Sequence, residues 1–408
     1  MNYKPSLKFI WISAFGPLVE IRIKEISKRL MAKGIHPIIF THKLQRKERL
    51  KPKSAKRDLF YYHFRNPLFF NFNIRIFKYI REIVTKFAFI LGGIPFLYSD
   101  IKSFLKNNDD IKFIYATGPP FFTHILGYLL KKKCKKKLIV EYTDPWYKNP
   151  YSEEKKNFFE KLLDYHIEKR ILQSADIIVS NTEFLNPILQ RNFPFIKNTP
   201  IFAIGDGFNL QEFEEIPQKD ENGIIITYGG KIYGRRNIYP LFKIISDLNK
   251  EHLFEDIKVL VKIYGFYPKK LFERIIDSLN IRDLFYLGGF LSRSHFIEEI
   301  MKSDIALHIG ENLDYPTIAF KVWEYLSCRK KILFLGLERS YRSDFIRNNN
   351  LGVVIPIDNL EKAKELLKDL FINIKNKKID LTFDENILKK FSWDNRAEKF
   401  IKNVINSL

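Results

Sequence analysis

Short apolar runs alternate with longer amphipathic stretches along the chain, and this alternation limits the folds open to it. The first series of runs is rich in Ile, Val, Phe and Tyr and covers 8–14, 36–41, 111–116, 138–142, 176–181 and 201–204. A helical pattern follows the first run over 18–33, where Gly34 can end the helix. Strands separated by helices in this way indicate a parallel sheet with helices on both faces.

A second series of runs repeats this architecture without repeating the sequence. Its runs cover 223–229, 258–265, 284–289, 304–310, 331–336 and 351–357, and its clearest helical pattern spans 361–371. A polar, acidic segment that contains a proline separates the two series at 209–222. We therefore predict an α/β protein with two doubly wound parallel-sheet domains, 1–208 and 209–390, and a C-terminal helix within 391–408 that packs on the first domain.

The composition of the chain limits the binding partners and the cellular compartment that we expect for the protein. Lys and Arg number 69 against 47 Asp and Glu, a net charge of +22 that favours anionic partners such as nucleic acid, phosphorylated small molecules or an anionic membrane. Cys134 and Cys328 lie far apart and lack metal-ligand spacing, so we expect neither a disulfide nor a zinc site. Since no run is long enough to span a bilayer and no signal peptide is evident, we expect a cytoplasmic protein, soluble or peripheral on the inner face of the membrane.

The segment 43–106 departs from the alternation. A basic run at 43–57 precedes a series of aromatic residues that begins at Phe60 and reaches Phe72. One interpretation is a solvated loop followed by core helices, and the other is a basic and aromatic surface that lies on an anionic membrane. We expect no nucleic-acid partner, because no RNA-binding signature accompanies the segment.

Candidate site residues lie in the loops that follow predicted strands, where ligands of doubly wound sheets bind. Gly16 lies in the first such loop, and its backbone can approach a ligand. Asp144 and Trp146 follow the run 138–142. Asp144 can accept a proton, bind a hydroxyl group or simply cap the next turn, and Trp146 can stack on a ligand.

The second half of the chain carries the candidate anion site. Lys231 and Arg236 lie five positions apart in a glycine-containing loop after a strand, so both can face a diphosphate unless they are merely solvated. Further on, a helix that begins near Ala319 offers free amide groups to phosphate and carries Glu324. A carboxylate at that depth binds hydroxyl groups, such as those of a ribose, or forms a structural ion pair.

Several segments together resemble a known family. The sequence KVWEYLSCRKKILFLG at 321–336 resembles the K-x-x-E-Y-L signature of GT-B glycosyltransferases, in particular the retaining family-4-like group. Segments at 116–132, 139–146, 175–185 and 204–213 are similar to further motifs of that group, in the same order. The resemblance extends over most of the chain and implies two Rossmann-like domains that face a central cleft.

The resemblance also implies a role for each candidate residue. Lys231 and Arg236 would bind the donor diphosphate and, with Asp144 near the transferred sugar, form the catalytic group. Glu324 would bind the ribose. The remaining donor-site residues, which would approach the phosphates or the base through their backbone, are Gly16, Gly230, Gly289, Phe290, Leu291, Ile318, Ala319 and Phe320.

Three positions depart from the family pattern. Pro316 stands where the first glutamate of the E-x7-E motif is expected. The basic pair is Lys then Arg instead of Arg then Lys, and these two cations are not equivalent. Asp206 and Asn209 stand where Asn and Asp are usual. These departures bear on the specificity for the sugar and on the activity itself.

The expected function is transfer of a hexose-type sugar from a nucleoside diphosphate donor to a glycan or lipid-linked acceptor, in surface polysaccharide or glycoconjugate synthesis. The resemblance implies retention of configuration, and we expect no metal and no other cofactor, because the cations would take the place of a divalent ion. Pro316 motivates an alternative, a catalytically silent GT-B scaffold that binds a glycan or a partner protein. A sugar-nucleotide epimerase is a weaker alternative, since it would need more converging carboxylates and histidines.

Overall fold

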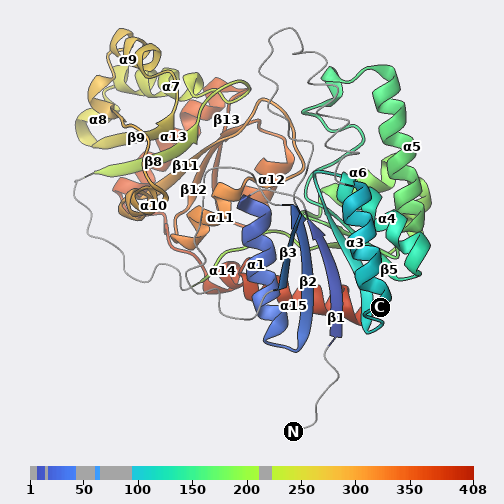
Figure 1. Cartoon of the computed structure of the whole chain (residues 1–408). Coiled ribbons are helices and arrows are strands. Elements are labelled where there is room, and N and C mark those ends of the chain that lie inside the picture. The colour runs from blue at the N-terminus through green and yellow to red at the C-terminus, as the bar shows by residue number, and fades with distance from the viewer. Residues whose placement is uncertain (1–6, 14–16, 43–59, 65–93, 211–222) are drawn as a thin grey trace. The chain divides into compact units, whose positions relative to one another are not determined.

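The computed structural model describes residues 7–13, 17–42, 60–64, 94–210 and 223–408 (Figure 1). The chain divides into two compact units. The first comprises Met1–Asp206 together with Trp393–Leu408, and the second comprises Gly207–Ser392. Each unit contains one parallel sheet, and the two are described separately below.

The first unit contains a seven-stranded sheet in the order β3-β2-β1-β4-β5-β6-β7, and each strand runs parallel to its neighbours. Its strands are β1 (Leu7–Ser13), β2 (Ile35–His42), β3 (Phe60–Phe64), β4 (Ile111–Gly118), β5 (Lys137–Tyr142), β6 (Ile177–Ser180) and β7 (Ile201–Ala203). Its helices are α1 (Pro17–Met31), α3 (Ile94–Lys106), α4 (Phe122–Cys134), α5 (Phe158–Ser174), α6 (Leu185–Asn192) and α15 (Trp393–Asn403).

Helices cover both faces of this sheet because successive residues of β1 point to opposite sides. Phe9 and Trp11 pack with residues of α1 and α15, and the Trp11 ring stacks on Phe400 of α15 with ring centroids 6.0 Å apart. Ile10 and Ile12 pack on the other face with residues of α3, α4, α5 and α6. The C-terminal helix is thus part of the core of the first unit.

A network of polar groups in the first unit connects α1 with β4, β5 and the residues that follow β7, up to Asp206. The Arg22 guanidinium on α1 donates to Glu141, to the Ile204 carbonyl and, over 3.1 Å, to Asp206. The second carboxylate oxygen of Glu141 accepts a 2.7 Å hydrogen bond from Thr117. Asp206, one of the departures from the family pattern, is therefore a partner of Arg22.

The second unit contains a six-stranded parallel sheet in the order β10-β9-β8-β11-β12-β13. Its strands are β8 (Ile224–Lys231), β9 (Val259–Phe266), β10 (Phe285–Leu287), β11 (Ile305–Ile309), β12 (Ile332–Gly336) and β13 (Gly352–Pro356). Its helices are α7 (Tyr239–Lys250), α8 (Leu253–Asp256), α9 (Lys269–Ser278), α10 (Arg293–Lys302), α11 (Phe320–Ser327), α12 (Tyr341–Asn348), α13 (Leu360–Lys375) and α14 (Glu385–Lys390).

Different helices cover the two faces of the second sheet. Alternate residues of β8 and β11 form a large apolar cluster with α7, α9 and α13. On the opposite face, α10 contacts β8, α11 contacts β11 and α12 contacts β12. This face carries α10 and α11, which begin beyond the carboxyl ends of β10 and β11 and contribute to the site described below.

The predicted α/β architecture of two doubly wound parallel sheets is confirmed, and a strand lies at every predicted run. The sequence analysis missed β3, which pairs with β2 at the edge of the first sheet. The interpretation of 43–106 as a loop followed by helices is wrong at Phe60–Phe64, since the sequence FYYHF is uniformly aromatic and lacks the alternation that marks a half-buried strand. Residues 43–59 and 65–93 lie outside the described residues, as does Gly16.

Candidate functional site

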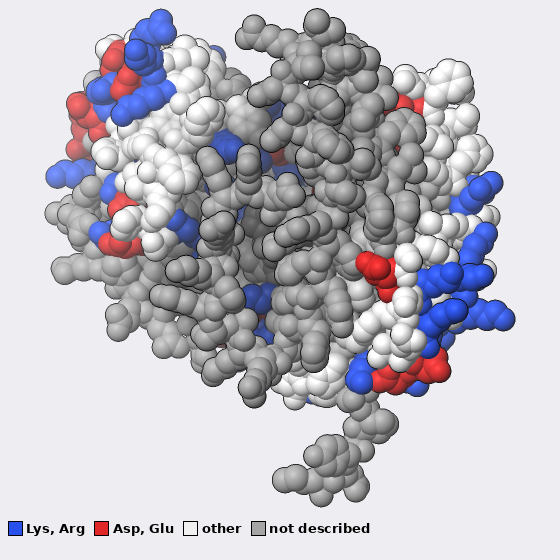
Figure 2. Space-filling model, viewed as in Figure 1, with Lys and Arg blue, Asp and Glu red and all other residues white. Residues whose placement is uncertain are grey.

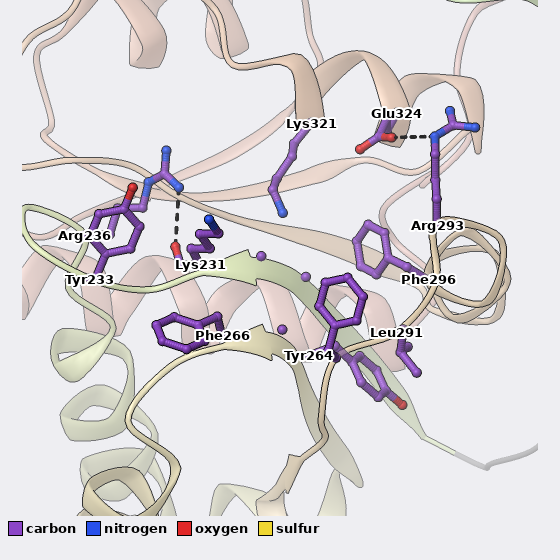
Figure 3. Close-up of a pocket in the computed structure, with 14 residues that line it drawn as sticks. Lys231, Tyr233, Arg236, Tyr264, Phe266, Leu291, Arg293, Phe296, Lys321 and Glu324 are labelled. Atoms are coloured by element: carbon purple, nitrogen blue, oxygen red, sulfur yellow. Dashed lines mark hydrogen bonds and ion pairs between the residues drawn. The ribbon is translucent and has the colours of Figure 1, made fainter. Parts of the chain in front are cut away.

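A pocket of about 810 Å³ lies at the carboxyl ends of the strands in the second unit (Figure 3). The ends of β8 and β9, the loops after β8 and β10, and helices α10 and α11 contribute to it. Its lining residues are Gly229, Gly230, Lys231, Tyr233, Arg236, Tyr264, Gly265, Phe266, Phe290, Leu291, Arg293, Phe296, Lys321 and Glu324. Lys231, Arg236 and Glu324, predicted from separate segments of the sequence, therefore line the same pocket.

Two glycines let the polypeptide come close together at the floor of the pocket. Gly230 and Gly265 have φ values of +146° and +115°, which side-chain-bearing residues rarely adopt. A Cβ atom on Gly265 would lie 2.2 Å from the Gly230 carbonyl oxygen, and one on Gly230 would lie 2.2 Å from the Lys321 Nζ. The absence of side chains here gives the Lys321 ammonium its place in the pocket.

The two predicted cations lie side by side after β8. Lys231 is exposed at the end of the strand, and the Arg236 Nη1 donates to its carbonyl oxygen over 3.3 Å (Figure 3). Both residues line the pocket.

A carboxylate that the sequence analysis missed holds Arg236. The Arg236 Nε donates to the Glu311 Oε1 over 2.9 Å, and Arg342 on α12 donates to Oε2 of the same carboxylate. Although burial raises the pKa of Glu311, the two guanidinium groups lower it from 4.5 to about 2. Glu311 is therefore ionised at neutral pH and fixes the direction of Arg236.

Lys321 is a second residue of the pocket that the sequence analysis did not assign. It is the second residue of α11, and its ammonium group points into the pocket (Figure 3). The Nζ lies 5.2 Å from the centre of the Tyr228 ring and 5.5 Å from that of Phe296. Burial lowers the pKa of Lys321 to about 8, an effect that Glu324 opposes and Arg236 reinforces.

Glu324 forms an ion pair within the pocket. Its Oε1 accepts a hydrogen bond from the Arg293 Nε over 3.1 Å (Figure 3). The Glu324 side chain is 15% exposed and that of Arg293 is 55% exposed, so the pair lies at the pocket wall and faces solvent on the arginine side. The ion pair that was one of the two alternatives for Glu324 is present, and it engages one of the two carboxylate oxygens.

The predicted base-binding segment leads into α10. The Gly289 carbonyl accepts a 3.0 Å hydrogen bond from the Gly265 amide, which ties this segment to the end of β9. Phe290 and Leu291 line the pocket, and the Phe290 side chain is 86% exposed.

The predicted phosphate-binding amides precede or begin α11. Phe320 is the first residue of the helix, and no side chain caps this end in the part of the chain that the structure describes. The side chains of Ile318 and Ala319 line a separate, much smaller cavity together with His308. Their backbone groups thus remain candidates, while their side chains point elsewhere.

Asp144 lies in the first unit, directly after β5, and Gly16 lies outside the described residues. The prediction that Trp146 is free to stack on a ligand is wrong. Its ring is 8% exposed and stacks on Phe121 with centroids 4.7 Å apart, and its indole Nε1 donates to Asp164 over 3.0 Å. Trp146 therefore supports the loop that carries Asp144.

Within the residues that the structure describes, no three His, Cys, Asp or Glu side chains are grouped so that they could hold a metal ion. No helix in the same part of the chain is long and apolar enough to cross a membrane.

The two parallel-sheet units define the class of fold, which is GT-B, as the sequence predicted. No family model matches the chain, and no curated protein matches it by sequence. Sucrose-phosphate synthase from Thermosynechococcus elongatus is similar over 97% of this chain and 97% of its own, with a TM-score of 0.64 at 14% identity. The lipopolysaccharide outer core galactosyltransferase WaaB is similar over 98% of this chain and 100% of its own, with a TM-score of 0.62 at 12% identity. A glycosyltransferase from Rickettsia africae is similar over 98% of this chain and 95% of its own, with a TM-score of 0.61 at 14% identity.

Replacement of Glu311 should destabilise the second unit in a pH-dependent way. Glu311→Gln leaves Arg236 and Arg342 without their shared anion, and we expect a loss of roughly 3 kcal/mol in unfolding free energy near neutral pH. The pKa of Glu311 is lowered on folding, so its stabilising effect is present above pH 4.5 and is lost as the pH falls toward about 2. Denaturant unfolding of both proteins over this range measures the difference, which should shrink in acid.

Glu361→Gln is the matched control, because the Glu361 side chain is 90% exposed. It should change the unfolding free energy little at any pH. A Glu311→Gln protein as stable as the wild type near neutral pH would show that the carboxylate does not hold the two arginines.

Proposed function

We propose that the protein is a glycosyltransferase that transfers a sugar from a nucleoside diphosphate donor to a glycan or lipid-linked acceptor. The observation that carries the proposal is the pocket of the second unit, where Lys231 and Arg236 lie together with Glu324. The GT-B fold supports it, as do the names of similar structures, which include a glycosyltransferase and a galactosyltransferase.

The chemistry of the pocket suits a departing nucleoside diphosphate. As the bond between the sugar and the diphosphate breaks, negative charge grows on the phosphate oxygen, and fixed cations stabilise that charge. Arg236 is held in place by Glu311 before any ligand arrives, so little reorganisation is needed when the charge develops. The uncapped amides at the start of α11 add partial positive charge at the same end of the sheet.

The remaining parts of the donor have candidate partners in the same pocket. Glu324 would accept hydrogen bonds from the ribose hydroxyl groups, through the oxygen that Arg293 does not engage. The backbone near Gly289 and the exposed Phe290 ring would contact the base. Asp144, in the first unit, would orient the acceptor hydroxyl group.

Several finer features belong to the proposal. The sugar is of the hexose type, and its transfer proceeds with retention of configuration. The reaction serves the synthesis of surface polysaccharide or glycoconjugate, in the cytoplasm. The cations take the place of a divalent metal, and no other cofactor takes part. A catalytically silent scaffold is the second candidate, favoured by Pro316 at the position of the expected sugar-binding glutamate.

Removal of either the Arg236 or the Glu324 side chain should reduce transfer strongly without unfolding the protein. We expect Arg236→Ala and Glu324→Ala each to lower sugar transfer or donor hydrolysis by more than about tenfold, because each removes a charged contact to the donor. The thermal midpoint should stay close to that of the wild type, since Glu311 keeps Arg342 as a partner. Release of nucleoside diphosphate from UDP-glucose, UDP-galactose, UDP-N-acetylglucosamine and GDP-mannose measures activity.

Arg274→Ala is the control, because Arg274 lies on α9 outside the pocket. Full activity of both site variants would contradict the site assignment. Wild-type protein that binds a nucleotide but neither transfers nor hydrolyses any donor would favour the silent scaffold.

Activity should not require a divalent metal. We expect donor turnover to be unchanged by EDTA, since the ammonium and guanidinium groups supply the positive charge at the diphosphate. The measurement is turnover after chelation and again after Mg²⁺ or Mn²⁺ is restored. A strict requirement for either ion would contradict the proposed role of the cations.

Peripheral association with an anionic membrane is a further part of the proposal. Four cations lie near the Cys134 thiol, since each acts to lower its pKa, although burial raises that pKa overall. They are Lys102 and Lys106 of α3, Lys133 of α4 and Lys136, which follows α4. Figure 2 shows Lys and Arg side chains on the side of the molecule that carries α4. Each lysine near an anionic bilayer contributes about 1 kcal/mol of attraction.

Charge reversal on this surface should release the protein from vesicles. We expect the wild type to sediment at low salt with vesicles that contain phosphatidylglycerol and not with phosphatidylcholine alone. Lys106→Glu, Lys133→Glu and Lys136→Glu together should abolish sedimentation, whereas Lys243→Glu, Lys269→Glu and Lys270→Glu in the second unit should not. A wild type that stays in the supernatant at low salt would contradict membrane association.

A further inference from the structure

Lys321 is a cation of the pocket that has no role in the proposed reaction as described so far. It reaches the pocket from α11 and passes the end of β8, where the absence of a side chain on Gly230 leaves room for its ammonium group (Figure 3). None of the ion pairs between described residues includes Lys321. The nearby charges that act on it are those of Glu324 and Arg236, of opposite sign.

This environment disfavours a positive charge unless an anion is present. Burial removes water from the ammonium group, and an unpaired buried charge is costly. The faces of Tyr228 and Phe296 offset part of this cost, because an aromatic ring attracts a cation over its face. The pKa of Lys321 is lowered accordingly, because burial disfavours the charged form and the Glu324 carboxylate opposes only part of that effect.

The position of Lys321 on α11 indicates which part of a ligand would supply that anion. Residues three apart on a helix share a face, so Lys321 and Glu324 point into the same pocket. Lys321 lies one turn nearer the start of the helix, on the side of Lys231 and Arg236 (Figure 3). A ligand that places its ribose at Glu324 and its phosphates at Lys231 and Arg236 must pass the Lys321 ammonium group.

We propose that Lys321 is a third cation of the donor site and binds the diphosphate directly, an inference that rests on the proposed function. The ammonium group donates to the phosphate oxygens from the floor of the pocket, while Lys231 and Arg236 approach from the loop after β8. The site thus holds the diphosphate from two elements of the fold, a strand-to-helix loop and a helix face.

The competing explanation is that Lys321 serves only to pack against Gly230, Tyr228 and Phe296. Lys321→Met separates the two, since methionine keeps an unbranched apolar stem of similar length and removes the charge. A packing role for the ammonium group predicts a lower thermal midpoint for the unliganded variant. A role in binding anions predicts an unchanged or higher midpoint, because a buried charge without a counterion has been removed.

The test is a calorimetric titration of wild type, Lys321→Met and the control Lys243→Met with UDP, GDP and ADP, and with the matching monophosphates. Lys243 is exposed on α7, outside the pocket. For the diphosphate that the wild type binds most tightly, we expect Lys321→Met to weaken affinity by about tenfold or more. The matching monophosphate should lose clearly less, and Lys243→Met should change neither affinity.

Each other outcome overturns the inference. Equal affinity of Lys321→Met and wild type for the diphosphate refutes the inference. An equal loss of affinity for diphosphate and monophosphate also refutes it, as does a lowered thermal midpoint of the unliganded variant. In those cases the proposed function stands, since the wild type still binds a nucleoside diphosphate. A wild type that binds none of the three diphosphates refutes the proposed function itself, and the inference with it.

Discussion

Parallel strand pairing in the second unit is the constraint on which the candidate site depends. Since β8, β9 and β11 all run in one direction, their carboxyl ends lie at one edge of the sheet. The loop with Lys231 and Arg236, the end of β9 at Gly265 and the segment that leads into α11 meet there, although they lie far apart in the sequence. Without this pairing, no segment of the chain would bring a basic pair and a carboxylate together.

The sequence predicts this framework well because the signals are local. The strands are short runs of Ile, Val, Leu and Phe that are buried on both faces, and such runs stand out between amphipathic helices. Lys231 and Arg236 can be predicted for a similar reason, because paired glycines and cations directly after a strand belong to one short segment. Glu324 can be predicted from its place in the helix that begins after the run 304–310, which forms β11.

The residues that the sequence does not predict depend on contacts between distant segments. Glu311 follows β11 without any periodic pattern, and its role appears only where it forms an isolated bridge with Arg236. Lys321 belongs to the K-x-x-E-Y signature, yet the direction of its ammonium group depends on the absence of a side chain at Gly230, on a different strand. The strand β3 was missed because uniform aromatic character conceals the period of two.

The net charge of +22 says less about function than the way in which the cations of the pocket are paired. Two guanidinium groups, Arg236 and Arg342, share the single carboxylate of Glu311, so this group of three keeps a positive charge. Four cations and one carboxylate line the pocket itself. The excess of positive charge in this pocket favours a ligand with two adjacent negative groups. The proposed diphosphate ligand meets this requirement, and Glu324 is the single carboxylate among the residues that line the pocket.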